Sequence, residues 1–302
     1  MNGKISNLNQ LAYVRRYTLS GGKEDGLKVC EINNGVIRLL LNESKAFDLM
    51  QLWHKGTNIS FVSKNGFSTS CGNFLTRFEG GMVYTCGLDS VGGREGFELH
   101  GSLHNHPAEV VSVECDEKEI KVVAKTYVTA LFGQNLVLTR TIKTGVNSSS
   151  VSIFDNLYNA GFKAENYALL YHVNLGYPMI DEGVKIISDE VSAVGRNDFA
   201  NKFLDSRKTF CANADFDEER CYFIDMKTPK VMVENQKLCK RFCLEYSSDS
   251  LPHFVQWNTF CSGDYALGLE PATTLLDDEF KYKTIGANEK IDFNLTLSVE
   301  DI

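Results

Sequence analysis

The nine residues Ile120-Lys121-Val122-Val123-Ala124-Lys125-Thr126-Tyr127-Val128 decide the fold class. Apolar and polar side chains largely alternate along them, which is the two-residue period of a strand with one buried face. Comparable runs, rich in β-branched and aromatic residues, recur along almost the whole chain and are separated by Asn, Asp and Gly turn residues. These runs cover residues 28–32, 36–41, 110–114, 136–142, 150–157, 167–173, 221–226, 230–233, 240–246, 253–260 and 291–299.

Helical patterns are almost absent, and only residues 8–14 and 198–203 suggest short helices. Many strands with short connections, and no strand–helix alternation, predict an all-β fold built as a large antiparallel β-sandwich. No internal repeat of 20 to 50 residues is visible, which disfavours a propeller. We therefore predict a single domain over residues 1–302, with residues 1–25 as an N-terminal extension that packs on it.

The composition excludes several classes of protein. The 302 residues are 43% hydrophobic, and 31 basic against 39 acidic residues give a net charge of −8, which argues against nucleic-acid binding. No stretch approaches the roughly 20 apolar residues of a membrane helix, and the polar start MNGKISNLNQ lacks the core of a secretion signal. Nine cysteines without a C-x-x-C pair are typical of reduced core residues. We expect a cytoplasmic protein with neither nucleic-acid nor membrane partners.

Residues 77–109 interrupt the strand pattern and combine many glycines with Arg77, Asp89 and His100. Glycine permits the close approach of a ligand, and loops on a rigid scaffold commonly carry binding groups. Tight turns alone would also explain the glycines, so a binding segment is the favoured of two interpretations.

The same segment contains His104-Asn105-His106 followed by Glu109, which suggests a metal site. On a strand, His104 and His106 would lie on one face, and Glu109 would add a carboxylate. The pattern resembles the cupins, which are also all-β. However, Pro107 interrupts the strand, and the Glu spacing is one residue short of the usual cupin pattern. A metal-dependent cupin-like sugar isomerase is therefore the less favoured alternative, and we predict no metal and no cofactor.

Two other segments place one ionisable residue in apolar surroundings. His172 ends an apolar strand, and Glu270 lies within the apolar run 265–273. A buried ionised carboxylate is very costly without partners, so Glu270 marks either a functional site or a structural ion pair. A lone histidine on an apolar strand is most often a hydrogen-bonded core residue. The residues alone leave both interpretations open.

Several short motifs carry a family resemblance. They are Phe78-Glu79-Gly80-Gly81-Met82, Thr85-Cys86-Gly87-Leu88-Asp89, Leu99-His100-Gly101, Pro107-Ala108-Glu109, Phe132-Gly133-Gln134-Asn135-Leu136, Tyr171-His172-Val173-Asn174-Leu175-Gly176-Tyr177-Pro178 and Gly268-Leu269-Glu270-Pro271. In this order, over roughly residues 30 to 300, they resemble the DUF4432 proteins, a family similar to the aldose 1-epimerases, or galactose mutarotases. The resemblance implies a galactose mutarotase-like supersandwich with a sugar site in a cleft on one sheet.

The resemblance also implies roles for four residues. In the epimerases a histidine after a strand is the general acid and a C-terminal glutamate is the general base; these match His172 and Glu270. An arginine and a second histidine, the latter in a Leu-His-Gly context, bind the sugar; these match Arg77 and His100. The segment His104-Asn105-His106 departs from the less charged residues that the family would have there.

The expected activity is cofactor-independent mutarotation of a hexose, a small-molecule sugar. One group takes the proton of the anomeric hydroxyl while another donates a proton to the ring oxygen. Glu270 as a carboxylate suits the first role, and His172, with an unperturbed pKa of about 6.5, suits the second. We expect these two side chains to face one another across a sugar-sized gap, without a direct salt bridge.

Four further residues are candidate sugar ligands. Trp257 would stack on the sugar ring, or else pack in the core. Hydroxyl groups would be bound by Asp89, Asn174 and Gln256, unless these residues serve turns and packing. A non-catalytic carbohydrate-binding protein is the main alternative function, and a homodimer is possible on this sequence.

Overall fold

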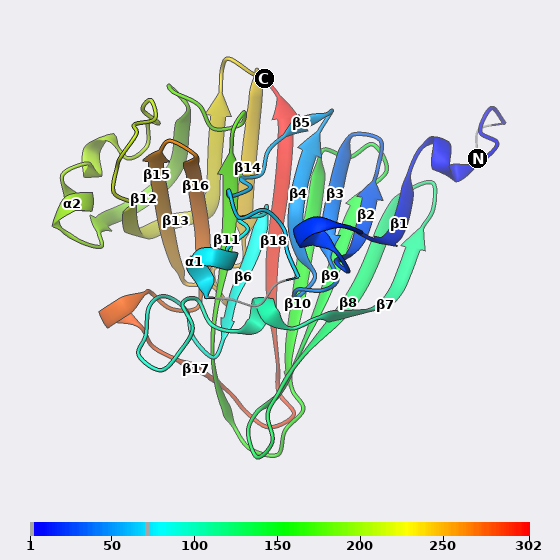
Figure 1. The fold of residues 1–302 in the computed structure, drawn as a ribbon, viewed down its shortest axis with the longest axis horizontal. Coiled ribbons are helices and arrows are strands. Elements are labelled where there is room, and N and C mark those ends of the chain that lie inside the picture. The colour runs from blue at the N-terminus through cyan, green and yellow to red at the C-terminus, as the bar shows by residue number, and fades with distance from the viewer. Residues whose placement is uncertain (1–2, 70–72) are drawn as a thin grey trace.

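The computed structural model describes residues 3–69 and 73–302, and antiparallel strands dominate it (Figure 1). The strands are β1 (Tyr13–Thr18), β2 (Lys28–Asn33), β3 (Ile37–Asn42), β4 (Asp48–His54), β5 (Thr57–Asn58), β6 (Val83–Leu88), β7 (Ala108–Cys115), β8 (Glu119–Thr129), β9 (Asn135–Gly145), β10 (Ser150–Asn159), β11 (Glu165–Gly176), β12 (Lys185–Gly195), β13 (Arg220–Asn235), β14 (Lys240–Tyr246), β15 (His253–Cys261), β16 (Asp264–Ala272), β17 (Lys283–Ile285) and β18 (Lys290–Asp301). The predicted all-β class is confirmed.

Helical elements are short. They are α1 (Phe74–Arg77), α2 (Asp198–Asn201) and the 3₁₀ turns η1 (Leu8–Gln10), η2 (Gly22–Glu24), η3 (Leu103–Asn105), η4 (Leu204–Ser206) and η5 (Asp277–Glu279). The helix expected at 8–14 is a single 3₁₀ turn, because β1 begins at Tyr13 and draws the chain into the sheet. Within residues 3–69 and 73–302, no helix has the length and apolar character required to cross a membrane.

The strands form two layers. One has the order β1–β2–β3–β4–β6–β11–β16–β15–β13, with β5 beside β4 and β17 beside β11. The other has the order β7–β8–β9–β10–β18–β14–β13–β12. Residues 220–224 of β13 pair with β15, and residues 230–235 pair with β14, so this strand belongs to both layers. Figure 1 shows β12 and β7 at opposite ends of the molecule.

The main apolar core lies between the layers and joins residues such as Leu39 of β3, Val122 of β8 and Leu297 of β18. Strand β11 is buried on both faces. Leu169, Tyr171 and Val173 belong to the main core, whereas Ala168 and Leu170 pack in a second cluster on the opposite face. A strand covered on both faces is apolar throughout, which explains its uninterrupted hydrophobic run. His172 and Asn174 share the face of Leu170, which we call the outer face.

The N-terminal segment contributes to the first layer. All six residues of β1 pair with β2, so residues 13–18 of the predicted extension form an edge strand. Residues 1–2 lie outside the described part of the chain. The eight cysteines within the described residues are free thiols, and Cys71 lies outside them.

Candidate active site

A cavity of about 670 Å³ opens on the outer face of the central strands. His172 of β11 and Glu270 of β16 line it together with Trp257 of β15 and His100 from the loop after β6. The remaining lining residues are Phe61, Ser63, Lys64, Asn65, Phe74, Leu75, Phe78, Gly92, Gly93, Leu99, Arg196, Asp217, Glu219, Cys221, Thr259, Cys261, Asp264 and Leu276. The volume is in the range of small-ligand sites.

His172 and Glu270 are in direct contact, with 3.2 Å between His172 Nε2 and Glu270 Oε1. The predicted sugar-sized gap between them is therefore wrong. The reason is strand register: β11 and β16 are neighbours, with Val173 opposite Leu269. Adjacent strands lie about 4.8 Å apart, which leaves no room for a sugar between two side chains that point the same way.

Gly268 makes this contact possible. A Cβ atom at this position would lie 2.6 Å from Glu270 Oε1, 2.9 Å from His172 Cε1 and 3.2 Å from the Cβ of Trp257. These separations are shorter than van der Waals contact, so any larger residue would displace the carboxyl group or the imidazole ring. The glycine is thus required by space.

Burial favours neutral forms of both groups. It lowers the pKa of His172 to about 3, helped by the nearby His100 and opposed by Asn174. Burial likewise raises the pKa of Glu270 well above its usual range, helped by Glu219 and opposed by Arg196. Burial therefore disfavours both the carboxylate form of Glu270 and the imidazolium form of His172. A neutral imidazole and a protonated carboxyl carry the same number of protons as that ion pair.

Both groups also have unsatisfied polar atoms. Among the described residues, His172 Nδ1 and Glu270 Oε1 are buried and have no hydrogen-bond partner, since the 3.2 Å approach of Glu270 Oε1 to His172 Nε2 lacks hydrogen-bond geometry. Leaving buried polar atoms unpaired costs about 1–3 kcal/mol each, and folded proteins seldom do so without a functional reason. Atoms of this kind beside a cavity find a partner either in the polar groups of a ligand or in an adjustment of a neighbouring polar side chain.

Aromatic rings surround the pair. The centroids of Trp257, Phe78 and His100 lie 5.4, 5.6 and 5.8 Å from that of His172. His100 has a left-handed backbone conformation with φ of 64°, uncommon for a residue with a side chain, and its ring packs against Phe74. Burial lowers the pKa of His100 to about 4, so this ring is neutral near pH 7.

The sequence did not indicate the charged residues around the cavity. Glu219 accepts hydrogen bonds from Trp257 Nε1 at 2.8 Å and from Arg196 Nη2 at 2.6 Å, which hold the indole in place. Lys64 Nζ pairs with Asp264 Oδ2 at 2.7 Å. No sequence signal marks these residues, since they stand in polar surroundings and become neighbours only through strand pairing.

Arg77 and Asp89, both expected to bind the sugar, do not line this cavity. Arg77 is buried in α1, pairs with Glu98 and borders a separate hollow of about 450 Å³. Asp89 accepts a hydrogen bond from the backbone N–H of Ser102 at 2.8 Å and borders another hollow. In this structure Asp89 therefore shapes the loop that carries His100.

Gln256 and Asn174 are also absent from the cavity lining. Gln256 lies on the inner face of β15, where its amide donates to Arg207 O at 3.1 Å and to Asn258 Oδ1 at 3.0 Å. Consecutive strand residues point to opposite faces, so Gln256 and Trp257 cannot both face one site. This corrects the expected placement of Gln256. Asn174 shares the outer face with His172, but its amide group donates to backbone carbonyls.

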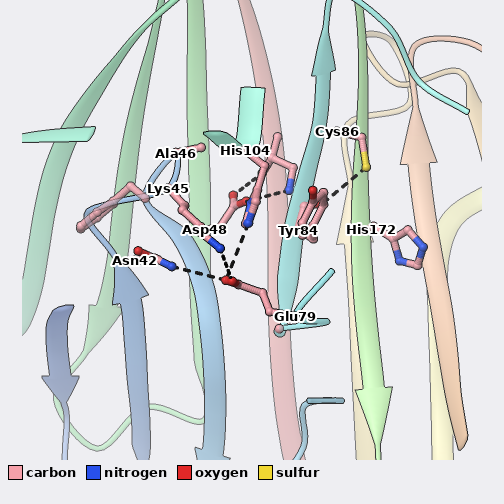
Figure 2. Close-up of polar contacts among 12 residues, drawn as sticks. Asn42, Lys45, Ala46, Asp48, Glu79, Tyr84, Cys86, His104 and His172 are labelled. Carbon is pink, nitrogen blue, oxygen red and sulfur yellow. Dashed lines mark hydrogen bonds and ion pairs between the residues drawn. The ribbon is translucent and has the colours of Figure 1, made fainter. Parts of the chain in front are cut away.

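His104 belongs to a separate buried network (Figure 2). Its Nδ1 lies 2.8 Å from Asp48 Oδ2 and its Nε2 lies 3.7 Å from Glu79 Oε1, while Lys45 Nζ lies 2.6 Å from Glu79 Oε2. Burial lowers the pKa of His104, but the hydrogen bonds with Asp48 and Glu79 outweigh it, so the pKa is raised. In Figure 2 no dashed line joins this network to His172.

The structure removes the geometric basis of the metal hypothesis. His104 lies in the turn η3 and His106 follows it, so the two rings do not share the face of a strand. Across the described ranges, no three His, Cys, Asp or Glu side chains gather in an arrangement that would hold a metal ion.

The two-layer antiparallel fold is galactose mutarotase-like. Residues 24–299 match the family described as Domain of unknown function (DUF4432), so the chain belongs to this family. The predicted family and its supersandwich fold are confirmed. No curated protein matches the sequence.

Solved structures resemble this fold at low sequence identity. A putative aldose 1-epimerase from Klebsiella pneumoniae subsp. pneumoniae MGH 78578 has a TM-score of 0.86 at 21% identity, over 95% of this chain and 83% of that one. A galactose mutarotase-like protein from Clostridium acetobutylicum has a TM-score of 0.71 at 14% identity, over 97% of this chain and 100% of that one. The galactose mutarotase related enzyme from Lactobacillus acidophilus has a TM-score of 0.63 at 9% identity, over 90% of this chain and 97% of that one. At these identities, the likeness concerns the fold alone.

Proposed function

We propose that this protein interconverts the anomers of a hexose in the cavity, with His172 and Glu270 as the proton-transferring pair. One observation carries the proposal: both side chains are buried at the cavity, in contact with each other, and each has a polar atom without a partner. Perturbed groups of complementary acid and base character in a cavity are typical of catalytic sites.

The chemistry requires an acid and a base that act together. When the ring opens, the base takes the proton of the anomeric hydroxyl, the C–O bond to the ring oxygen breaks, and the acid protonates that oxygen. The neutral pair supplies both, with the imidazole of His172 as base and the carboxyl group of Glu270 as acid. In the ionic form of the pair the two roles exchange, as the family resemblance implies. Rotation of the open aldehyde and reclosure then reverse both transfers, so the pair ends as it began.

The surroundings suit a pyranose. Trp257 offers a flat apolar surface that Glu219 holds in place, and His100 offers a neutral ring that can accept or donate a hydrogen bond. Both cationic side chains of the lining, Arg196 and Lys64, pair with carboxylates. This charge balance favours a sugar without a phosphate group.

The test follows a freshly dissolved α-anomer by NMR, using glucose and galactose as probes. The protein should accelerate the approach to anomeric equilibrium, and His172→Gln and Glu270→Gln should each reduce the acceleration about 10²- to 10⁴-fold. His253→Gln is a matched control, because this histidine lies on the neighbouring strand β15 outside the cavity lining. It should retain the activity of the unmodified protein.

Saturable binding without faster exchange would contradict the proposed turnover and would support a carbohydrate-binding protein. The cytoplasmic location and the homodimer stay predictions. Light scattering across a concentration series would measure the oligomeric state.

A further inference from the structure

Two buried atoms without a hydrogen-bond partner among the described residues belong to side chains on the outer face of β11. They are His172 Nδ1 and Asn174 Oδ1. Residues two apart in a strand point to the same face, so these side chains are neighbours. The Asn174 oxygen is only an acceptor, whereas a ring nitrogen of histidine donates when it carries the proton. The two unsatisfied atoms are therefore chemically complementary.

The orientation of the Asn174 amide group is set by its nitrogen. Nδ2 donates to Gly81 O at 3.1 Å and to His172 O at 2.9 Å. Backbone carbonyls only accept, so the end of the amide that faces them is the nitrogen. The end that remains is an oxygen in a fully buried side chain. It has to accept a hydrogen bond or stay unsatisfied.

The contact with Glu270 links the proton of the carboxyl group to the choice of ring nitrogen that carries the proton of His172. Glu270 Oε1 lies 3.2 Å from His172 Nε2. If the imidazole is neutral and the carboxyl proton is directed at Nε2, that nitrogen presents its lone pair to the carboxyl group. The single ring proton then resides on Nδ1 and requires an acceptor.

We propose that Asn174 is a positioning residue, whose Oδ1 accepts a hydrogen bond from His172 Nδ1–H and fixes His172 in the Nδ1-protonated tautomer. The opposite tautomer would point a bare nitrogen at the amide oxygen and an N–H at the carboxyl. Asn174 also raises the pKa of His172, which is the direction expected when an acceptor stabilises the N–H form. The expected sugar-hydroxyl role of Asn174 is replaced by this one.

The consequence for turnover rests on the proposed function. With Nδ1 protonated, Nε2 faces Glu270 with a lone pair, so the pair holds one acidic proton and one basic site. Loss of the acceptor allows the ring to rotate or change tautomer, which removes the base. A partner that holds a reacting histidine in one tautomer acts through that histidine without touching the substrate.

The test reads the tautomer directly, by long-range ¹H–¹⁵N NMR of histidine-labelled protein at pH 7. The chain has six histidines, and His172→Gln identifies the signal of His172. We expect the Nδ1-protonated pattern in the unmodified protein. Asn174→Leu removes the acceptor and should shift the ¹⁵N pattern toward the Nε2-protonated form. With the α-sugar probes, it should lower kcat about 10- to 100-fold with little change in KM.

Asn174→Asp provides a second variant that preserves the shape of the side chain. Its anionic acceptor should make His172 take up a proton at higher pH, so the pH midpoint of the His172 signals should rise. Asn258→Leu is the matched control, since Asn258 is equally buried but lies on the inner face of β15. It should leave the His172 pattern unchanged.

An Nε2-protonated His172 in the unmodified protein, or unchanged His172 shifts in both Asn174 variants, would overturn the proposal. The NMR result stands whether or not any sugar is turned over. Failure of the proposed function and failure of this inference are therefore separate outcomes.

Discussion

His104 and His172 each contact a buried carboxyl group, and the two sites are surrounded in opposite ways. At His104, the carboxylates of Asp48 and Glu79 each have a cation of their own, Arg140 and Lys45. In the part of the chain that the structure describes, no such cation contacts the His172–Glu270 pair, since Arg196 pairs with Glu219 and Asp277.

The difference shows in the pKa directions. At His104 the hydrogen bonds with Asp48 and Glu79, together with their charges, outweigh burial and raise the pKa, which favours the charged imidazolium. At His172 burial dominates and lowers the pKa, while the pKa of Glu270 rises. Compensated charges hold a fold together, whereas uncompensated neutral groups beside a cavity stay available for proton transfer. The contrast distinguishes the proposed proton-transferring pair from the other histidine–carboxylate site better than the presence of a histidine does.

The largest expected contrast is in stability. Asp48→Asn leaves the buried Arg140 and His104 without a shared counter-charge, so it should lower the free energy of unfolding by about 3–5 kcal/mol. Glu270→Gln removes no ion pair with a cation and should change it by less than about 1 kcal/mol. Urea unfolding at pH 7 measures both. Equal decreases in the free energy of unfolding for Asp48→Asn and Glu270→Gln would contradict the proposed difference between the two sites.

The next test concerns the close packing of Gly268 against His172 and Glu270. Gly268→Ala places a methyl group against Glu270 and His172 and should lower the proposed mutarotation rate about 100-fold, since a displacement of about 1 Å suffices for such a loss. Gly145→Ala is the control, because its Cβ would meet nothing nearer than Ser148 Cβ at 3.5 Å. Full activity in Gly268→Ala would exclude a requirement for the observed contact.

The two histidines should differ in how their protonation changes the free energy of unfolding with pH. The pKa of His172 is about 3 in the folded state and about 6.5 when unfolded, so the unfolded chain binds the proton first and stability falls as the pH drops below 6.5. Between pH 7 and pH 5, the free energy of unfolding should therefore fall by about 1–2 kcal/mol less in His172→Gln than in the unmodified protein.

His104 has the opposite sign. Its folded pKa is raised, so its contribution is present below pH 6.5 and is lost as the pH rises through the folded value. In the unmodified protein the free energy of unfolding should therefore fall as the pH rises through the folded pKa of His104, and His104→Gln should lack this decrease. Unfolding measured at pH 5, 7 and 8.5 for both variants gives the two slopes, and slopes of the same sign would contradict the contrast.

The smallest expected effect concerns the cavity wall. Trp257→Phe removes the hydrogen bond to Glu219 and should weaken sugar binding several-fold, corresponding to about 1 kcal/mol. Trp53→Phe is the control, since Trp53 lies on β4 beneath Arg38. Calorimetric titration with the sugar that gives the fastest exchange compares them. An equal effect of both substitutions would rule out a specific role for Trp257.

The sequence predicted the fold because half-buried strands such as β8 show their period directly. It located His172 and Glu270 because a polar residue in an apolar strand is conspicuous. It could not predict their contact, which depends on the register of β11 against β16, strands about 100 residues apart along the chain. Glu219 and Arg196 were missed for the same reason, because the pairing of β12 with β13 brings them together.

Gln256 illustrates a different failure. Two consecutive residues of one strand, Gln256 and Trp257, were both expected to contact the sugar, whereas the period of two allows only one of them to face a given side. Arg77 was placed by a loose match, and its position in the short helix α1 depends on local packing that no periodicity describes.

The bridging strand β13 has a consequence for protein engineering. Glu219, which braces the indole of Trp257, directly precedes this strand, while the far half of the same strand is bonded into the opposite layer. A displacement of one layer relative to the other would thus move β13 and, through Glu219, the indole of Trp257 at the cavity. Attempts to shorten this protein to a fragment that retains the cavity should keep both layers, because strand β13 belongs to both of them.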